Sequence, residues 1–426
     1  MLKSLHKKFN ASAERIAIFS IVGLIFQSGI IYLVTMLWAK WLGPEGYGEY
    51  SHLWSSILIV ASFASFGMPL LLQRELPRQS MKERKKLITV VFITLPFLLV
   101  ITSIFVLAAN SLNSNITYGF SRGIILILAS LFYLVFTMLE AVFKGMLLYS
   151  EIDLLKKFLF PAALLTGTVL FTFTFERTSF EDYIYLRLLC MFLIIFLLIA
   201  RHKEILALDF NIRKIDIFSL LSVSRNFFIG SSVILLGGEL SIFFSGFYLE
   251  SAELGAYSLG VRIATIVNMA LIGANVPAMQ TISKLAHQDK FNNMEVTAKK
   301  TARVAFFGAI FLYGIALLSI DILLYIFDLS FNKKIIFHTV ACVGGAYLLS
   351  AFLGPAGVVL NMSGREKYAN FSAILSLVIM GIILMLFSSQ FGYLSVVLAF
   401  SCNIIVWKLS MTLIVRKLYK FWTTVI

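Results

Sequence analysis

Long apolar runs separated by short polar segments dominate the pattern of the chain. A membrane-spanning helix needs about 20 mostly apolar residues, and twelve runs satisfy or approach this requirement. The predicted spans are residues 16–37, 50–72, 87–109, 123–147, 158–175, 183–200, 227–249, 255–282, 304–327, 335–360, 368–387 and 393–415. The polar segments between them are too short to form a separate soluble domain. The pattern therefore predicts an all-α, polytopic membrane protein with about 12 transmembrane helices.

The basic residues are distributed unevenly among the polar segments. With the amino terminus placed in the cytoplasm, the cytoplasmic segments hold 26 Lys and Arg residues and the outer loops hold 5. Short cytoplasmic loops carry an excess of Lys and Arg in membrane proteins. We therefore predict that both termini are cytoplasmic.

Composition supports the membrane assignment and excludes several functions. The chain is 59% hydrophobic and only 14% charged, with a mean hydropathy of +0.91. Its net charge of +14 would suggest nucleic acid in a soluble protein, but here the basic residues alternate with apolar runs, so we expect no nucleic-acid partner. The three cysteines and five histidines are scattered, and no catalytic, metal-binding or cofactor motif is visible. We expect a transporter and not an enzyme.

A short internal repeat suggests two halves of the same topology. Gly48-Glu49-Tyr50-Ser51 opens the second span and Gly255-Ala256-Tyr257-Ser258 opens the eighth, 207 residues later. Parallel repeats of this kind build many transporters. We predict two six-helix lobes around a central cavity, formed by residues 1–200 and 217–426 and joined by a cytoplasmic linker at 201–216.

Charged residues inside the apolar runs are the candidates for function, because they are costly in hydrocarbon and usually face a cavity or the interior of a bundle. Glu140 and Lys144 are spaced i,i+4 on one helix face. They form either an intrahelical ion pair or a site in which Lys144 lines a cytoplasmic vestibule for an anionic substrate.

Glu239 and Arg262 are the second such pair. At 1.5 Å per residue, they lie about 15 Å and about 10 Å from the outer ends of two successive antiparallel helices. They are expected to meet, as a structural ion pair or as a gating or binding pair. Asn268 and Asn275 share a face of the same helix as Arg262, which points about 120° away from them, so an interhelical seam is the alternative for the two amides.

Other intramembrane charges lie nearer the predicted interfaces. Arg187, Asp321 and Lys408 are within reach of the headgroups, where long side chains extend toward water. Arg74, at the end of the second span, is either a cytoplasmic anchor or a ligand for the substrate. Gln27 adds a polar group at mid-membrane depth.

Residues 38–78 resemble a known family. Leu-Gly-Pro-Glu-Gly-Tyr-Gly-Glu-Tyr-Ser at 42–51, preceded by Gln27 and followed by Gly67 and Arg74, is similar to the first two helices of Wzx-type flippases of bacterial polysaccharide synthesis. These flippases belong to the multidrug/oligosaccharidyl-lipid/polysaccharide exporter (MOP) superfamily. In the second half, 253–258, 262–264 and Pro277 match again. The family often carries Asp-Arg in the middle of helix 7, where this chain has Glu239-Leu240.

The resemblance implies a function. Such proteins move undecaprenyl-pyrophosphate-linked oligosaccharide repeat units from the cytoplasmic to the periplasmic leaflet of the bacterial inner membrane, for O-antigen (lipopolysaccharide) or other polysaccharide pathways. Arg262, Lys144, Arg74, Gln27, Asn268 and Asn275 are the expected substrate-binding residues, and Glu239 and Glu140 are the expected coupling or gating acids. A proton or sodium gradient is the expected energy source. Membrane lipids, a polysaccharide polymerase and chain-length regulator proteins are the expected partners.

Two alternatives compete with the flippase. A multidrug or small-molecule cation-coupled antiporter belongs to the same superfamily. A membrane glycan polymerase or ligase would usually carry a large periplasmic loop with catalytic residues, and the longest outer loops here, 38–49 and 110–122, are too short for one.

Overall fold

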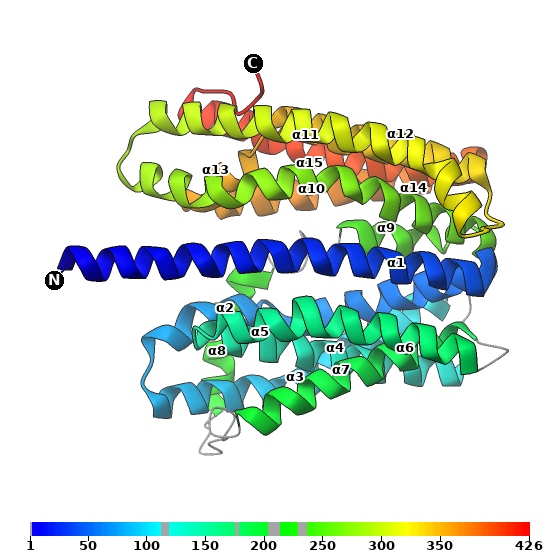
Figure 1. Cartoon of the computed structure of the whole chain (residues 1–426), viewed down its shortest axis with the longest axis horizontal. Coiled ribbons are helices and arrows are strands. Elements are labelled where there is room, and N and C mark those ends of the chain that lie inside the picture. The colour runs from blue at the N-terminus through cyan, green and yellow to red at the C-terminus, as the bar shows by residue number, and fades with distance from the viewer. Residues whose placement is uncertain (1, 112–118, 175–178, 203–213, 229–236) are drawn as a thin grey trace. The chain divides into compact units, whose positions relative to one another are not determined.

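A computed structural model describes residues 2–111, 119–174, 179–202, 214–228 and 237–426 (Figure 1). Every regular element in these ranges is helical. Ten of the described helical segments are long and apolar enough to cross a membrane. The predicted all-α, polytopic membrane class is therefore confirmed.

The described chain divides into two compact units, which we consider separately. The first contains the described residues of 2–42 and 56–228, and the second contains Gly43–Ser55 and the described residues from Gly237 to Ile426. The predicted linker at 201–216 lies mostly outside the described residues, so that boundary between lobes stays a prediction.

The long first helix contributes to both units. In the first unit it is followed by α2 and a short 3₁₀ turn and then by four further membrane-length segments. The elements are α1 (Leu2–Ser65), α2 (Met68–Glu75), η1 (Leu76–Arg78), α3 (Met81–Ser111), α4 (Phe120–Gly145), α5 (Tyr149–Asp153), the π-helical turn η2 (Leu154–Leu159), α6 (Phe160–Thr174), α7 (Phe180–Arg201) and α8 (Lys214–Phe228).

Most of the second unit is a bundle of long helices. They are α9 (Gly237–Ser245), α10 (Ser251–His287), α11 (Phe291–Ile326), α12 (Lys333–Leu353), α13 (Ala356–Met362), α14 (Glu366–Phe391) and α15 (Tyr393–Tyr419). Helix α10 packs against α11, α12 and α13, and α15 packs against α12, α13 and α14. Helix α12 packs against both of them, so α10, α12 and α15 form the centre of this unit.

Two predicted spans account for the difference between twelve predictions and ten segments. The first two spans are joined in α1, which is interrupted at Gly43 (φ 68°) and resumes at Pro44. A positive φ suits glycine, and proline is well placed at the first turn of a helix. The seventh span, 227–249, includes residues 229–236, which are outside the described part, and α9 (Gly237–Ser245) forms most of the rest of it.

The tenth predicted span, 335–360, is wrong as a single helix. Helix α12 ends at Leu353, Gly354 takes a φ of 78°, and α13 starts after Pro355. Proline has no backbone N–H to continue the helix. A Cβ on Gly354 would also lie 2.1 Å from the carbonyl oxygen of Thr423, so the C-terminal tail packs directly against this break.

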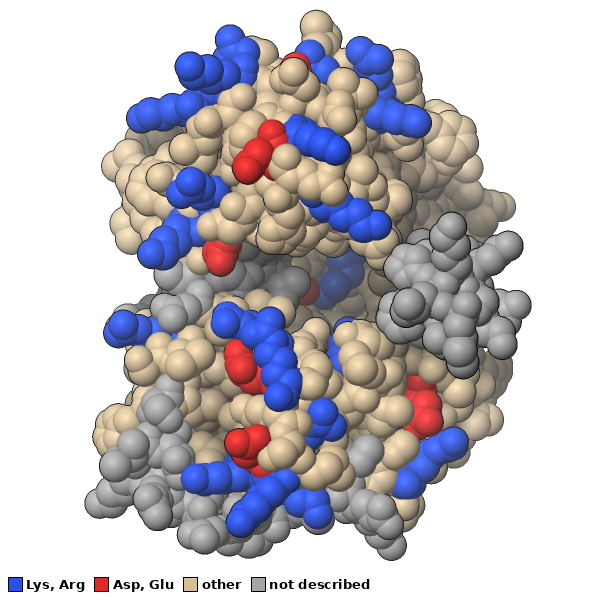
Figure 2. Space-filling view, turned by 90° about the vertical axis from the view of Figure 1, so that its left-hand side faces the viewer, with Lys and Arg blue, Asp and Glu red and all other residues tan. Residues whose placement is uncertain are grey.

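Exposed apolar and basic side chains fit a protein in a bilayer. Phe105, Phe173 and Leu318 are 75%, 88% and 76% exposed, which suits contact with lipid tails and not with water. Lys and Arg side chains gather around the turn between α10 and α11, as Figure 2 shows. Lys284 and Lys290 are exposed there, within the segment predicted to be cytoplasmic.

Candidate functional site

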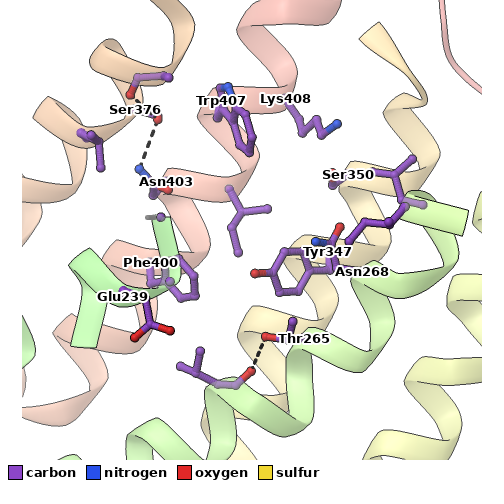
Figure 3. Close-up of a pocket in the computed structure, with 18 of the residues that line it drawn as sticks. Glu239, Thr265, Asn268, Tyr347, Ser350, Ser376, Phe400, Asn403, Trp407 and Lys408 are labelled. Atoms are coloured by element: carbon purple, nitrogen blue, oxygen red, sulfur yellow. Dashed lines mark hydrogen bonds between the residues drawn. The ribbon is translucent and has the colours of Figure 1, made fainter. Parts of the chain in front are cut away.

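A cavity of about 530 Å³ lies within the second unit and is named here the C-terminal cavity (Figure 3). Five helices contribute to its wall: α9, α10, α12, α14 and α15. The polar, charged and aromatic residues on the wall are Glu239, Arg262, Thr265, Asn268, Asn275, Tyr347, Ser350, Ser376, Phe400, Asn403, Trp407 and Lys408. Most ligand sites are similarly apolar with a few placed polar groups.

The predicted pair of Glu239 and Arg262 meets on this wall. Arg262 Nη2 lies 3.8 Å from Glu239 Oε1, and the two side chains are 28% and 19% exposed. Glu239 Oε2 is buried and has no hydrogen-bond partner among the described residues. The guanidinium is therefore held at the edge of the cavity by a loose ion pair, and one carboxylate oxygen is left over.

The two asparagines of α10 line the same cavity as Arg262. Their position on one helix face left open whether they belong to a seam between helices. The cavity is wide, so residues over a broad arc of the α10 surface line it. The long Arg262 side chain extends into the cavity from the edge of this arc, although its Cα lies about 120° from those of the asparagines. Asn275 Oδ1 is buried without a partner in the described part of the chain, so it is available to a ligand or to water.

Sequence reasoning missed one part of the wall. Tyr347, Asn403 and Trp407 line the cavity, and so does Lys408, which we expected near the membrane interface. Asn403 Nδ2 donates to Ser376 Oγ at 3.1 Å, which fixes the amide, as Figure 3 shows. The available signal was the i,i+4 spacing of Asn403 and Trp407, which places these two residues on one side of α15.

The first unit holds the other predicted pair. Lys144 Nζ lies 2.7 Å from Glu140 Oε1, as the i,i+4 spacing predicted. Lys156 of η2, which the sequence did not single out, contacts the second oxygen of Glu140. Glu140 is 13% exposed and the two lysines are 25% and 28% exposed. The acid is therefore bound on both sides, and this cluster carries one net positive charge.

Arg74 and Gln27 also belong to the first unit, and neither is among the residues that line the C-terminal cavity. Arg74 Nε lies 3.2 Å from Glu75 Oε1, the guanidinium is 5.5 Å from the centre of the Phe227 ring, and its side chain is 53% exposed. It lines an open pocket with Lys86 and Glu83. Gln27 is half-buried on α1.

The remaining intramembrane charges have local partners. Asp321 Oδ1 is 2.6 Å from Lys333 Nζ at an exposed position, and Arg187 lies 5.9 Å from the centre of the Trp38 ring. Within the described ranges, no three His, Cys, Asp or Glu side chains form a group that could hold a metal ion.

The internal repeat has a structural counterpart in the second unit. A Cβ on Gly48 would lie 1.8 Å from the carbonyl oxygen of Ser251, and one on Gly255 would lie 2.1 Å from that of Pro44. The two copies of the motif therefore cross each other with their backbones in contact. Glycine permits this close approach of helices in membranes.

Solved structures share this architecture. An inward-facing multidrug resistance MATE family transporter of the MOP superfamily matches with a TM-score of 0.75 at 16% identity, over 94% of this chain and 98% of that chain. The lipid II flippase MurJ, in an inward closed conformation, matches with a TM-score of 0.75 at 14% identity, over 94% and 87%. A MOP superfamily transporter from Pyrococcus furiosus matches with a TM-score of 0.57 at 14% identity, over 95% of each chain.

The fold is thus that of the MOP superfamily of membrane transporters. No curated protein matches the sequence. Residues 15–285, more than half of the chain, match the family described as polysaccharide biosynthesis protein, and the chain belongs to this family. The resemblance inferred from the motif at 42–51 is confirmed.

Proposed function

We propose that this protein is a flippase for undecaprenyl-pyrophosphate-linked oligosaccharide repeat units. It moves them from the cytoplasmic to the periplasmic leaflet of the bacterial inner membrane by alternating access. Membership of the polysaccharide biosynthesis family supports a glycan as part of the substrate. A structural neighbour that is a lipid II flippase supports a lipid-linked substrate.

The observation that carries the proposal is the position of Arg262 on the wall of the C-terminal cavity, only loosely paired with Glu239. A guanidinium presents two parallel N–H donors to a phosphate, and such charge-assisted bonds are stronger than neutral ones. A diphosphate therefore competes well with a carboxylate 3.8 Å away. We propose that Arg262 alternates between Glu239 and the pyrophosphate.

The other predicted residues take subsidiary roles in this proposal. Asn268 and Asn275 bind hydroxyl groups of the glycan. Lys144, Arg74 and Gln27 attract or guide the anionic substrate on its way. Glu239 couples transport to a proton or sodium gradient when Arg262 releases it, and Glu140 serves as a second gating acid. No cofactor or metal takes part in this scheme.

A transport assay with purified protein tests the proposal. Vesicles containing the protein and a fluorescent prenyl-diphosphate-linked oligosaccharide are treated with a membrane-impermeant quencher, and the fraction of protected probe is followed. We expect the protein to make the inner pool accessible, and Arg262→Ala to remove most of this activity. Movement of the probe at the rate of protein-free vesicles contradicts the proposal.

A cation-coupled drug antiporter is the second candidate, favoured by the unpaired carboxylate oxygen of Glu239 in the cavity. The same vesicles separate the two functions when a fluorescent organic cation replaces the lipid. Uptake of the cation driven by a proton or sodium gradient, without any movement of the lipid probe, supports the antiporter.

In the cell, we propose that the flippase supplies a polysaccharide polymerase and its chain-length regulator with repeat units for O-antigen or a related polymer. Both termini are cytoplasmic in this arrangement. Glycosyltransferase genes next to the gene for this protein are the expected genomic context. A drug-responsive regulator as the only neighbour favours the antiporter.

A further inference from the structure

Three buried polar atoms on the wall of the C-terminal cavity have no hydrogen-bond partner in the described residues. They are Glu239 Oε2, Asn275 Oδ1 and Trp407 Nε1. A buried polar group without a partner costs roughly 1–3 kcal/mol, so these atoms require water or a ligand. The set contains one donor, the indole N–H, and two acceptors.

This combination of donors and acceptors fits a hydroxylated ligand. A hydroxyl group accepts a hydrogen bond from the Trp407 indole and donates its own proton to the Asn275 carbonyl oxygen. An organic cation satisfies the carboxylate of Glu239 but gives the indole N–H nothing to bind. The aromatic rings of Trp407 and Tyr347 on the same wall also offer flat apolar surfaces with a polar tip, which suit the faces and the edges of a sugar ring.

The charges in the cavity add a further condition. Arg262 has Glu239 as its counterion, whereas Lys408 has no acidic partner among the residues that the structure describes. The centre of the Trp407 ring is 5.7 Å from its Nζ. A half-buried ammonium group without a counterion attracts an anionic ligand.

The two cations are also well separated. Phe400 lies beside Glu239 in Figure 3, while Trp407 and Lys408 lie at the opposite end of the view. From Phe400 to Lys408, α15 rises about 12 Å at 1.5 Å per residue. This distance leaves room for sugar units between an anion at Arg262 and a second anion at Lys408.

We infer that Lys408, Trp407 and Asn275 form a subsite for an acidic sugar, in which Lys408 pairs with a carboxylate of the uronic acid type. The inference rests on the proposed function and specifies its substrate: the repeat unit carries a negatively charged sugar in addition to the pyrophosphate. The shared chemistry is an anionic oxygen group, so the experiment must separate a sugar carboxylate from the phosphates of the lipid.

Three probes make this separation. The first is a prenyl-diphosphate-linked trisaccharide that ends in glucuronic acid, the second is the same compound with the carboxyl group reduced to a primary alcohol, and the third is the prenyl diphosphate alone. Their affinities are measured with purified protein in lipid nanodiscs. Wild-type protein is expected to bind the acidic probe about tenfold or more tightly than the reduced one, at the lower end of what a hydrogen bond to a charged group contributes.

Variants then assign the preference to Lys408. Lys408→Gln is expected to bind the acidic and reduced probes equally, Lys408→Arg to keep most of the preference, and neither to change the binding of the prenyl diphosphate. Lys417→Gln is the matched control, because Lys417 is an exposed residue of the same helix that is not on the cavity wall. It should behave like wild type. Trp407→Phe should weaken the binding of both the acidic and the reduced glycan, because it keeps an aromatic ring but loses the indole N–H donor.

Each other outcome has a distinct meaning. Equal binding of the two glycans by the wild type overturns the acidic subsite, and if vesicles still show flipping of both, the proposed function stands. If Lys408→Gln weakens the binding of the acidic probe and of the prenyl diphosphate equally, Lys408 binds a phosphate of the lipid. This result also overturns the acidic-sugar subsite. A protein that binds none of the probes and moves none of them refutes both the subsite and the flippase.

Discussion

The hydroxyl of Ser258 donates a hydrogen bond to the hydroxyl of Ser51 at 3.1 Å, although the two residues are 207 positions apart. They are the last residues of the two copies of the internal repeat. The glycines that open the copies, Gly48 and Gly255, are in backbone contact in the same crossing. The repeat therefore reflects a physical requirement, since a Cβ on either glycine would collide with the backbone of the other helix.

A methyl group at this crossing should destabilise the protein. We expect Gly255→Ala to lower the free energy of unfolding by about 1–3 kcal/mol, because the added Cβ overlaps the Pro44 carbonyl oxygen and the helices must separate. Gly273→Ala in the same helix is the control, since nothing lies within 4 Å of its Cβ position. Thermal unfolding in detergent measures both variants, and equal stability of the two would contradict the close crossing.

The topology can be tested with reporter fusions after residues 80, 113, 209 and 426. The excess of Lys and Arg in the predicted cytoplasmic segments predicts a cytoplasmic reporter signal for the fusions after residues 80, 209 and 426 and a periplasmic signal for the fusion after residue 113. A periplasmic signal from any of the first three fusions would overturn the assignment of the segments to the two sides.

Much of the fold could be predicted because the bilayer imposes a simple rule. Every spanning segment must be apolar over a fixed length, and loop charges fix its direction. The meeting of Glu239 and Arg262 was also predictable, since both helices are consecutive and a short turn makes them antiparallel neighbours. The break at Gly354 could also have been predicted, because Gly-Pro is a strong turn signal. The apolar run continues on both sides of it, so the prediction treated 335–360 as one helix.

The rest of the cavity depends on packing between helices that are distant in sequence. Lys408 and Trp407 on α15 face Asn268 and Asn275 on α10, and Tyr347 on α12 completes the wall. No local pattern specifies which helices become neighbours. The contact of Lys156 with Glu140 was hidden for a similar reason, because a π-helical turn at 154–159 sets the direction of the lysine.

The C-terminal tail should contribute to stability. Phe421 is buried in a cluster with Met294, Val359 and Met411, and Thr423 Oγ1 donates to the Leu353 carbonyl oxygen at 2.7 Å. We expect Phe421→Ala to cost about 3–5 kcal/mol, as for other buried phenylalanines.

Ile426, at the end of the same tail, is 81% exposed, so Ile426→Ala should leave the melting temperature unchanged. Thermal unfolding in detergent again provides the measurement. A Phe421→Ala protein as stable as Ile426→Ala would show that the tail is not docked as described.

The Glu140 cluster should respond strongly to loss of its acid. Glu140→Gln leaves Lys144 and Lys156 together without a counterion in a mostly buried place, and we expect a loss of about 3 kcal/mol or more. Glu295→Gln is the control: its i,i+4 partner Lys299 is 3.0 Å away, and both side chains are about one third exposed. Such a pair contributes about 1 kcal/mol or less. Equal effects of the two substitutions on thermal unfolding would contradict a structural role for Glu140.

Arg262 and Glu239 offer the sharpest separation of structure from function. If Arg262 binds the pyrophosphate, Arg262→Ala should stay in the membrane at normal levels and lose surface polysaccharide. Arg262→Lys should restore part of it, because a point cation still attracts phosphate but lacks the bidentate fork.

A pair of Arg262 and Glu239 that only stabilises the fold behaves differently: neutralising either side lowers the protein level, and exchanging the two charges restores it. The double variant E239R/R262E should instead remain inactive, because a carboxylate then occupies the place of the phosphate ligand. Immunoblots of the membrane fraction and staining of the surface polysaccharide measure the two quantities independently. Full export by Arg262→Ala at normal protein levels would remove Arg262 from the transport mechanism.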